Sequence, residues 1–387
     1  MNGPLMMDTD VLVIGGGISG CALAYFLAKE GVEVSLVERS GLNSQASGAN
    51  AGSLHGQIPH NIFLEKGEKW AFSFGPTLQL MRESLELWRD MEDLLEVDLE
   101  VRVSGGLLVA STEKEMRDVR AKVLIEKKFG VQAEILSRLD LRQHAPYISD
   151  KMVGAAFYPE EGKANPLLVT PAFAAHAEKF GAKISRRVEV KSISVVRNGF
   201  QVDTTKGIIT CNRIGNCAGA DAGRISAMVG LDIPIMGDPI QVNVTEPIAP
   251  LIEHLVYSAK DKLTLKQTRH GSCIIGGGWP SRVDPDTGNL YVSQESVSKN
   301  LQVAIEMVPI LRNVALVRTW PARVNGADDW QPILGEDPMV PGFFTNAFPW
   351  MGFSGGPVSS RVTADLMLGR SVNGIPGRLA DSVHQNF

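Results

Sequence analysis

The stretch DVLVIGGGISGCALAYFLAKEGVEVSLVERS, residues 10–40, decides the fold of this chain. Residues 11–14 are apolar and β-branched at three of four positions, as a strand buried in a parallel sheet requires. Apolar residues then recur at the spacing of one helix face until Gly31, which is suited to end a helix. A second apolar run, residues 32–37, ends at Glu38. The stretch therefore predicts a strand–helix–strand unit of an α/β fold.

The turn between the first strand and the helix carries the pattern G-x-G-x-x-G at Gly15, Gly17 and Gly20. The first glycine permits the tight turn, the second lets the backbone approach a pyrophosphate, and the third lets the helix pack close to the strand. The helix N-terminus then offers free N–H groups to the phosphates. Glu38 follows Gly20 by eighteen residues, where a carboxylate would accept hydrogen bonds from ribose hydroxyls. These features predict a dinucleotide site for NAD or FAD.

Length, charge and cysteine usage exclude several other classes of protein. A chain of 387 residues is longer than one core usually holds, so we expect two domains. A net charge of −5 gives no sign of a basic surface, so nucleic acid is not expected as a partner. The four cysteines form no C-x-x-C pair, so neither a zinc site nor an iron–sulfur cluster is expected. Buried free thiols are expected instead, in a chain from a reducing, cytoplasmic compartment.

No targeting or membrane-spanning segment is expected. The N-terminal residues MNGPLMMDTD lack a basic region followed by an apolar one, so they do not match a signal peptide. No apolar run reaches the roughly 18 residues that a membrane-spanning helix needs.

Downstream of the first unit, the patterns alternate between helical and β-rich segments. Helices are expected over residues 77–95, 113–129 and 297–308, and another is expected near Pro171. Strands are expected at residues 106–110, from Gly154, in three or four short pieces over 188–216, and at 241–245, 263–268 and 273–275. The last group alternates loosely and carries polar residues, which favours an antiparallel sheet with one covered face.

The order of these segments predicts a discontinuous α/β architecture, α+β overall. A Rossmann-like dinucleotide-binding domain is expected from residues 8–76, 150–225 and 320–387. An antiparallel, β-rich substrate-binding domain is expected from residues 77–149 and 226–319.

At this point the chain resembles the FAD-dependent D-amino-acid oxidase family, which includes glycine oxidase, the β subunits of sarcosine oxidase, and opine and D-hydroxyproline dehydrogenases. The resemblance covers almost the whole chain. It rests on VLVIGGGISG with LVER, on ASGANAGSL, on NCAGADAG, and on PILG with MGFSGG. The second stretch, at this spacing after the first, is specific to the family. The resemblance implies noncovalent FAD as the cofactor.

The resemblance also gives a reason for QASGANAGSLHGQIP, residues 45–59, which is almost free of bulky side chains before Leu54. In the family, the loop equivalent to residues 44–53 runs beside the pyrophosphate and the flavin ring, where only small residues permit close approach. Ser47 and Asn50 are then expected to donate to the cofactor, as are backbone N–H groups that follow them. A flexible linker is the alternative, but it fits poorly because the stretch has no charge and ordered apolar residues follow it.

Two further sites follow from the same resemblance. The strand at 188–190 matches the one that places backbone groups against adenine, and the turn at 352–356 opens the last helix, whose dipole would stabilise negative charge on the reduced ring. The residues expected to bind FAD are Gly15, Gly17, Ile18, Ser19, Gly20, Glu38, Arg39, Ser44, Ser47, Gly48, Asn50, Ala51, Gly52, Val188, Ala218, Gly219, Gly352, Phe353, Ser354 and Gly355.

The chain departs from the family where the substrate carboxylate would bind. Glycine oxidase-like members carry W-x-G-x-R-P-G, and their arginine holds that carboxylate, whereas this chain reads TWPARVNGADDWQPILG. Without a gap, Val324 takes the arginine position and Arg323 lies one residue earlier, on the opposite face of a strand. Arg323 is therefore one candidate for the carboxylate, and Arg269 and Lys266 are its rivals.

His55 is the one histidine in the small-residue stretch, and three roles stay open for it. It could hold the flavin covalently, as a histidine does in some family members, or it could line the flavin face or substrate pocket. It could also be a loop histidine that is hydrogen-bonded to backbone. Arg323, Arg269 and His55 are thus the candidate catalytic residues.

The resemblance implies oxidation of the C–N bond of a secondary amine or of an N-substituted or D-amino acid, with hydride transfer to flavin N5. Opine, D-hydroxyproline and sarcosine types are the implied substrates. The chain looks most like the catalytic β subunit of a heteromeric dehydrogenase, with an α subunit and small electron-transfer subunits as partners. A stand-alone oxidase that forms H₂O₂ remains open, as does a flavin-binding protein without amine oxidation.

Overall fold

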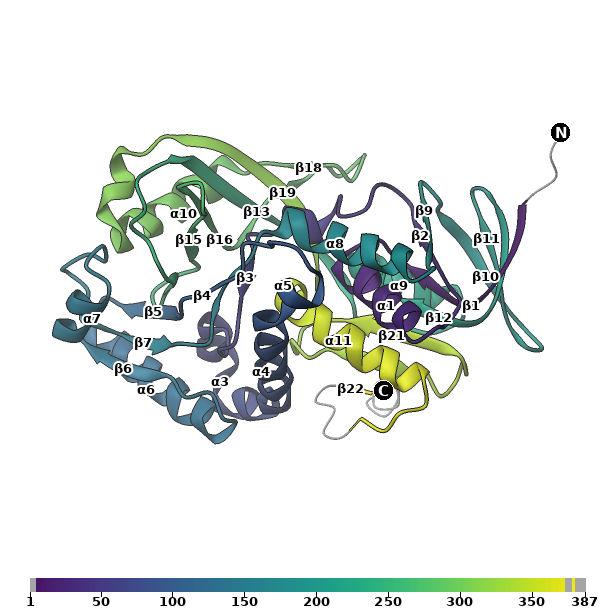
Figure 1. Cartoon of the computed structure of the whole chain (residues 1–387). Helices are drawn as coiled ribbons and strands as arrows, with labels where there is room; N and C mark the ends of the chain where they lie inside the picture. The colour runs from purple at the N-terminus through teal and green to yellow at the C-terminus, as the bar shows by residue number, and fades with distance from the viewer. Residues whose placement is uncertain (1–4, 373–377, 380–387) are drawn as a thin grey trace.

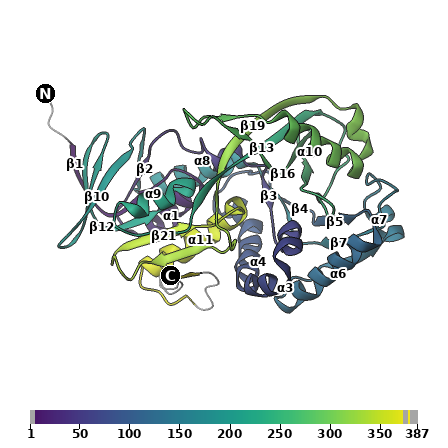
Figure 2. The same cartoon turned by 180° about the vertical axis from the view of Figure 1, so that it is seen from behind.

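The computed structural model describes residues 5–372 and 378–379, so part of the predicted segment 320–387 lies outside the described residues. Two large sheets lie toward opposite ends of the molecule, with helices packed around and between them (Figures 1 and 2). One sheet has nine strands and the other has eight. This arrangement confirms the predicted mixed α/β fold.

The nine-stranded sheet grows from the stretch that opens the chain. Strand β1 (Leu5–Ile14) lies between β2 (Val34–Glu38) and β12 (Gly207–Asn216) and is parallel to both. The remaining strands are β9 (Lys183–Arg186), β10 (Val190–Val196), β11 (Gly199–Thr204), β20 (Ile333–Glu336), β21 (Phe343–Ala347) and β22 (Arg378–Leu379). Neighbouring strands therefore come from the beginning, the middle and the end of the chain, as the Rossmann-like prediction requires.

Helix α1 (Ile18–Lys29) connects β1 to β2 and packs against two later helices, α8 (Pro166–Lys179) and α11 (Gly352–Met367). The chain had been expected to enter α8 near Pro171. The helix instead begins five residues earlier, because Pro166 occupies its first turn and the Asn165 side chain accepts from the Leu167 N–H at 3.0 Å.

The eight-stranded sheet has the order β19-β13-β16-β15-β14-β5-β7-β6. Its strands are β5 (Gly106–Ala110), β6 (Glu134–Ser137), β7 (Gly154–Tyr158), β13 (Met236–Pro247), β14 (Leu255–Ser258), β15 (Thr264–Gln267), β16 (Ser272–Pro280) and β19 (Leu316–Gly326). The pairs are antiparallel, as expected, except that β14 runs parallel to β5. Because β7 pairs with β5 and β6, this sheet continues past the boundary predicted at residue 150.

The other helices are α2 (Ala46–Ala49), α3 (His60–Ser73), α4 (Gly75–Arg89), α5 (Met91–Leu94), α6 (Glu113–Lys128), α7 (Arg138–His144), α9 (Ala222–Ala227) and α10 (Gln294–Met307), with 3-10 turns η1 (Gly219–Asp221) and η2 (Pro309–Asn313). The single helix predicted over 77–95 is two helices, α4 and α5, because the backbone leaves the helical region at Asp90. Short strands complete the fold: β3 (Ser53–Leu54), β4 (Arg102–Val103), β8 (Gly162–Lys163), β17 (Arg282–Val283) and β18 (Leu290–Tyr291).

Separate apolar clusters cover the two sheets. One runs from α1 through α4 and α11 and includes Tyr25, Trp88 and Phe348. Another packs α10 against the eight-stranded sheet. The four cysteines are buried and free, as the sequence predicts.

Candidate active site

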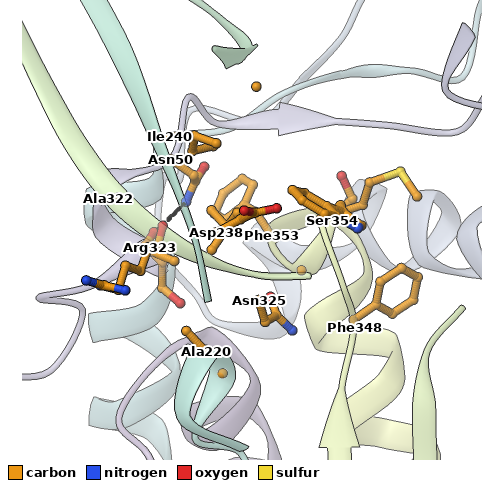
Figure 3. A pocket seen from close by; sticks show the side chains of 18 of the residues that line it. Asn50, Ala220, Asp238, Ile240, Ala322, Arg323, Asn325, Phe348, Phe353 and Ser354 are labelled. Atoms are coloured by element: carbon orange, nitrogen blue, oxygen red, sulfur yellow. Dashed lines mark hydrogen bonds between the residues drawn. The ribbon is translucent and has the colours of Figure 1, made fainter. Parts of the chain in front are cut away.

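A cavity of about 750 Å³ lies between the two sheets. It runs from the glycine turn after β1 to side chains of β14 and α6. Strands β13 and β19 and the N-terminus of α11 form its middle, where Asp238, Asn325 and Phe353 lie (Figure 3). A cavity of this size and shape, closed by residues from both ends of the chain, is typical of a cofactor site.

Backbone geometry explains the glycines at the first end. Gly15 has φ +114°, and a Cβ atom there would lie 2.4 Å from the carbonyl oxygen of Cys217. A Cβ at Gly20 would lie 1.9 Å from the carbonyl oxygen of Gly15. Gly17 differs, because a Cβ there would meet only the Ser47 side chain, at 2.9 Å to Oγ. Gly15 and Gly20 are thus needed by the turn itself, whereas Gly17 keeps the cavity wall open.

Glu38 lies at this end of the cavity with its carboxylate held by main-chain donors. Its Oε2 accepts from the Gly16 N–H at 2.7 Å, and its Oε1 accepts from the Ser40 N–H at 2.7 Å. Each oxygen keeps a further lone pair for a hydroxyl group. The neighbouring Arg39 lines the cavity but pairs with Asp221, at 2.6 Å.

Within the small-residue stretch, residues Ala46–Ala49 form a short helical turn, α2, and the chain then passes through a loop into β3. Ser47 Oγ accepts from the Ile18 N–H at 2.9 Å, so this side chain caps the start of α1. The Asn50 amide nitrogen donates to the carbonyl oxygens of Ala46 and Ser47, and its Oδ1 accepts from the Gly52 N–H at 2.6 Å. Both side chains line the cavity, but their strongest contacts are with the loop that they stabilise.

Five of the residues expected to bind the cofactor do not line the cavity: Gly20, Ser44, Gly48, Gly52 and Gly355. The glycines among them permit close packing within the protein. A Cβ at Gly48 would lie 2.0 Å from the Asn43 carbonyl oxygen, and one at Gly52 would lie 2.3 Å from that of Ala164. Their role is therefore to let the wall of the cavity fold.

The residues predicted to lie against adenine and those predicted at the start of the last helix line the same cavity. Val188, Ala218 and Gly219 line it, as do Gly352, Phe353 and Ser354 at the start of α11. The Val188 N–H, however, donates to the carbonyl oxygen of Glu38 at 2.9 Å, so it is already engaged. Two helix N-termini, those of α1 and α11, thus face one cavity and favour negative charge within it.

Ser354 joins the end of the chain to the small-residue stretch. Its Oγ donates to the Ser53 carbonyl oxygen at 3.0 Å and accepts from the His55 N–H at 2.8 Å. Its own carbonyl oxygen accepts from Trp88 Nε1 at 2.9 Å. These bonds fix where the His55 side chain leaves the backbone.

His55 lines the cavity and contacts the side chain of Tyr257 from β14, with 2.8 Å between Nδ1 and the Tyr257 hydroxyl. Burial, with Lys266 nearby, lowers the pKa of His55 to about 3, so its ring is neutral at physiological pH. Lys266 is buried and donates to Ser53 Oγ, and burial lowers its pKa to about 7.

The structure separates the two arginine candidates. Arg323 lines the cavity, but its Nη2 donates to the Gly288 carbonyl oxygen at 2.7 Å, and Figure 3 shows its guanidinium extending away from Phe353 and Ser354. Arg269 is outside the cavity, in the turn between β15 and β16, where it pairs with Asp98 on the exposed surface. The expectation that Arg269 binds substrate is therefore not supported by its position.

Apart from His55, the sequence did not indicate the residues at the polar end of the cavity. Glu161 accepts from the Gly56 N–H at 2.6 Å, from the Gln57 N–H at 3.1 Å and from Gln57 Nε2 at 2.8 Å. Gln57 in turn accepts from Lys122 Nζ at 3.1 Å. Burial raises the pKa of Glu161 to about 7, despite these donors.

Lys122 and Glu126 form an ion pair on α6 at the same end, with 2.6 Å between Nζ and Oε1 and neither side chain exposed. His60 lies beside Lys122 with both ring nitrogens buried. Burial and the charge of Lys122 lower the pKa of His60 to about 3. No pattern could have grouped these residues, because they are spread from residue 57 to residue 161.

The donors at the first end suit FAD on structural grounds alone. Two helix N-termini would face the pyrophosphate and the ring, the Glu38 carboxylate would face ribose hydroxyls, and small residues line the wall between them.

No helix in the described part of the chain is long and apolar enough to cross a membrane.

Comparison with known proteins identifies the family of the chain and its cofactor. Residues 10–366 match the family described as FAD dependent oxidoreductase, DAO. The chain is 26% identical to the sarcosine oxidase subunit beta of Arthrobacter sp. over 362 residues, covering 90% of this chain and 84% of that one. It is 27% identical to the glycine oxidase of Geobacillus kaustophilus over 367 residues, covering 92% of each.

Solved structures show the same fold. The L-proline dehydrogenase of P. horikoshii superposes with a TM-score of 0.84 at 27% identity, covering 96% of each chain. The glycine oxidase structure from Geobacillus kaustophilus gives a TM-score of 0.84 over 95% of this chain and 96% of that one.

Proposed function

The chain belongs to the DAO family of FAD-dependent oxidoreductases, and from that premise we propose that it oxidises the C–N bond of a secondary amine or N-substituted amino acid. At the coarser level, amine or amino-acid oxidation of the sarcosine, glycine or proline type is what its relatives share. The proposal of a secondary amine or N-substituted amino acid as substrate rests on one observation: a single cavity joins the glycine turn to the neutral imidazole of His55. FAD, when bound, accepts the hydride that leaves the substrate carbon.

The residues that would hold FAD are those that line the first end of the cavity. Glu38 would accept from ribose hydroxyls, and the N-terminus of α1, with Gly17, Ile18 and Ser19, would face the pyrophosphate. The N-terminus of α11 would stabilise negative charge on the ring. We propose a noncovalent complex, which acid precipitation tests: colour retained in the pellet would instead indicate a covalent bond and implicate His55.

The polar end of the cavity would hold and orient the substrate. The His55 ring is neutral, so it presents a hydrogen-bonding group rather than a charge to an amine. No strong base is required, because the neutral form of the amine already carries the electron pair that assists hydride departure. Arg323 remains the candidate for the substrate carboxylate, since it lines the cavity whereas Arg269 does not.

We further propose that the chain acts as the catalytic β subunit of a heteromeric dehydrogenase. Its similarity to sarcosine oxidase β subunits over most of both lengths supports this proposal. An α subunit and small electron-transfer subunits would then copurify with the active protein. The isolated chain would reduce an artificial dye quickly and dioxygen slowly.

The similarity to glycine oxidases keeps a second candidate, a stand-alone oxidase. That candidate predicts one species in size-exclusion chromatography and stoichiometric hydrogen peroxide from substrate and air. Peroxide formation by the lone chain at the rate of dye reduction would overturn the heteromeric proposal.

An anaerobic screen tests the chemistry itself. The yellow protein is mixed with amino acids, N-alkyl amino acids, proline derivatives and opines, and bleaching of the flavin absorbance is followed. We expect bleaching by at least one secondary amine. A protein that keeps its colour with every amine would be a flavin-binding protein without amine oxidation.

A further inference from the structure

Tyr257 lies between His55 and Glu161 at the inner end of the cavity. Its hydroxyl is 2.8 Å from His55 Nδ1. Burial raises the pKa of Tyr257, and the charge and side-chain hydrogen bond of the Glu161 carboxyl beside it raise it further. The three side chains come from the small-residue stretch, from β14 and from the turn before β8, and they form one row in which Glu161 is fully buried and Tyr257 and His55 are half-buried.

The number of protons in this row fixes the direction of its hydrogen bonds. An ionised carboxylate can only accept, and a tyrosine hydroxyl has one proton to donate. If Tyr257 donates to Glu161, its oxygen must accept from His55, so Nδ1 carries the proton. A neutral imidazole then has a lone pair on Nε2. Among the described residues, His55 Nε2 has no hydrogen-bond partner, and the ring lines the cavity.

We propose that Glu161 is a positioning residue that acts through Tyr257 and holds His55 in the Nδ1–H tautomer, so that Nε2 accepts a hydrogen bond from the substrate amine. The identity of the amine rests on the proposed function, but the tautomer is a property of the protein itself. A secondary amine in its neutral form has one N–H to donate, and this arrangement orients it without taking its proton.

The proposal makes the tautomer depend on pH. The groups that face Glu161 are Lys122 and Glu126 from α6, Tyr158 from β7 and Tyr257 from β14, and Lys266 from β15 faces His55. Because the pKa of Glu161 is raised to about 7, its carboxylate is ionised above that pH and protonated below it. Once protonated, it no longer requires the Tyr257 proton, and Tyr257 can donate to Nδ1 instead.

The test reads the tautomer directly in the FAD-loaded protein. Histidine labelled with ¹⁵N distinguishes a protonated from an unprotonated ring nitrogen, and the His55 signals are identified among the seven histidines by their loss in His55→Asn. We expect Nδ1–H above pH 7 and a shift toward Nε2–H below it. In Glu161→Gln the side-chain amide donates to Tyr257, so Nε2–H is expected at every pH.

Two further variants keep the proposal falsifiable. Tyr257→Phe removes the hydroxyl that connects Glu161 to His55, so the tautomer should become mixed and independent of pH. This variant replaces Glu161→Gln as the test if Glu161→Gln fails to fold. Tyr158→Phe makes the same change beside Glu161 without touching His55 and should leave the tautomer as in the wild type. Retention of Nδ1–H in both Glu161→Gln and Tyr257→Phe would overturn the proposal.

A tautomer change with its midpoint near pH 7 that survives in Glu161→Gln would be due to Lys266, because burial lowers the pKa of Lys266 to about 7 as well. That result would also overturn the proposal.

Bleaching of the flavin by amines distinguishes a failure of the tautomer proposal from a failure of the proposed function. If the tautomer changes as expected but no amine bleaches the flavin, the proposed function fails while the row of hydrogen bonds stands. If amines bleach the flavin in all variants with one pH profile, the positioning role fails and the proposed function stands.

Discussion

The cavity wall beside Gly17 consists mostly of main chain, whereas the wall beside Tyr257 consists of polar side chains from separate elements. The first end is centred on one stretch of the sequence, residues 10–40, whose donors are N–H groups of a turn and a helix start, and Ser47, Val188 and Ala218 complete its wall. The second end brings together His55, Glu161 and Tyr257, which are up to 202 residues apart. Main chain recognises what all members of a fold family share, and side chains distinguish their substrates.

The largest effect is expected from Gly17→Val. In the protein alone a Cβ atom meets only Ser47 Oγ, at 2.9 Å, so the fold should survive, but the added side chain fills space that the pyrophosphate needs. We expect FAD binding to be lost, as measured by flavin absorbance after purification with excess FAD. Gly41→Ala is the control, because a Cβ at Gly41 meets only Ser44 Cβ, at 3.9 Å, and the backbone there is not in the left-handed region. Unchanged affinity in Gly17→Val would remove the nucleotide site from this turn.

Removing the charge of Lys122 tests the other end through stability. Lys122→Ala leaves the Glu126 carboxylate buried without its partner, which costs about 3–5 kcal/mol of the free energy of unfolding. The measurement is denaturant unfolding of the FAD-loaded protein. Lys299→Ala is a matched control, because Lys299 and Glu295 form a pair of the same spacing on α10 that is exposed. Its removal should leave the free energy of unfolding nearly unchanged, because solvent screens an exposed pair. Equal losses of stability in the two variants would contradict the contrast.

Glu38→Ala tests whether a side chain matters at the main-chain end. It removes the acceptor of the Gly16 N–H and the expected partner of the ribose, so FAD should bind more weakly by about 1–3 kcal/mol. Titration of the apoprotein with FAD measures the loss. Glu33→Ala removes an exposed carboxylate paired with Lys183 and should leave FAD affinity unchanged.

The smallest effect is expected from Arg269→Ala. Its guanidinium is exposed, pairs with Asp98 and lies outside the cavity, so the KM for substrate should stay as in the wild type. Steady-state kinetics with any amine that bleaches the flavin would measure it. A large increase in KM would place Arg269 in the substrate site and weaken the division between the two ends.

The same division explains what the sequence could predict. The strand–helix–strand unit, its glycines and Glu38 were predictable because they form one motif of fixed spacing within residues 10–40. The length of α8 was misjudged because Pro171 looked like a helix start, although Pro166 after Asn165 is the better one. The pairing of β7 with β5 is a contact across the chain that neither strand encodes by itself.

The substrate end could not be predicted for the same reason. Glu161 reads in sequence as one of two neighbouring acids in a turn, and Lys122 reads as one of several charges on a surface helix. Only the fold shows that both are buried and that they face Gln57. The small-residue stretch was recognised, but the capping role of Ser47 and the folded turn of Asn50 depend on α1 and on the turn itself.

The bonds from Ser354 to Ser53 and His55 have a consequence for how the protein is made. A ribosome releases the glycine turn first and the start of α11 last, so nearly the whole chain must emerge before the two can meet. Strand β1 can pair with β12 and α1 can pack against α8 well before that, but α1 lacks α11 until residues 352–367 emerge. The nascent chain must therefore keep the surface that α11 will cover from aggregating until then, and the cavity wall at Ser354 is completed only when α11 docks.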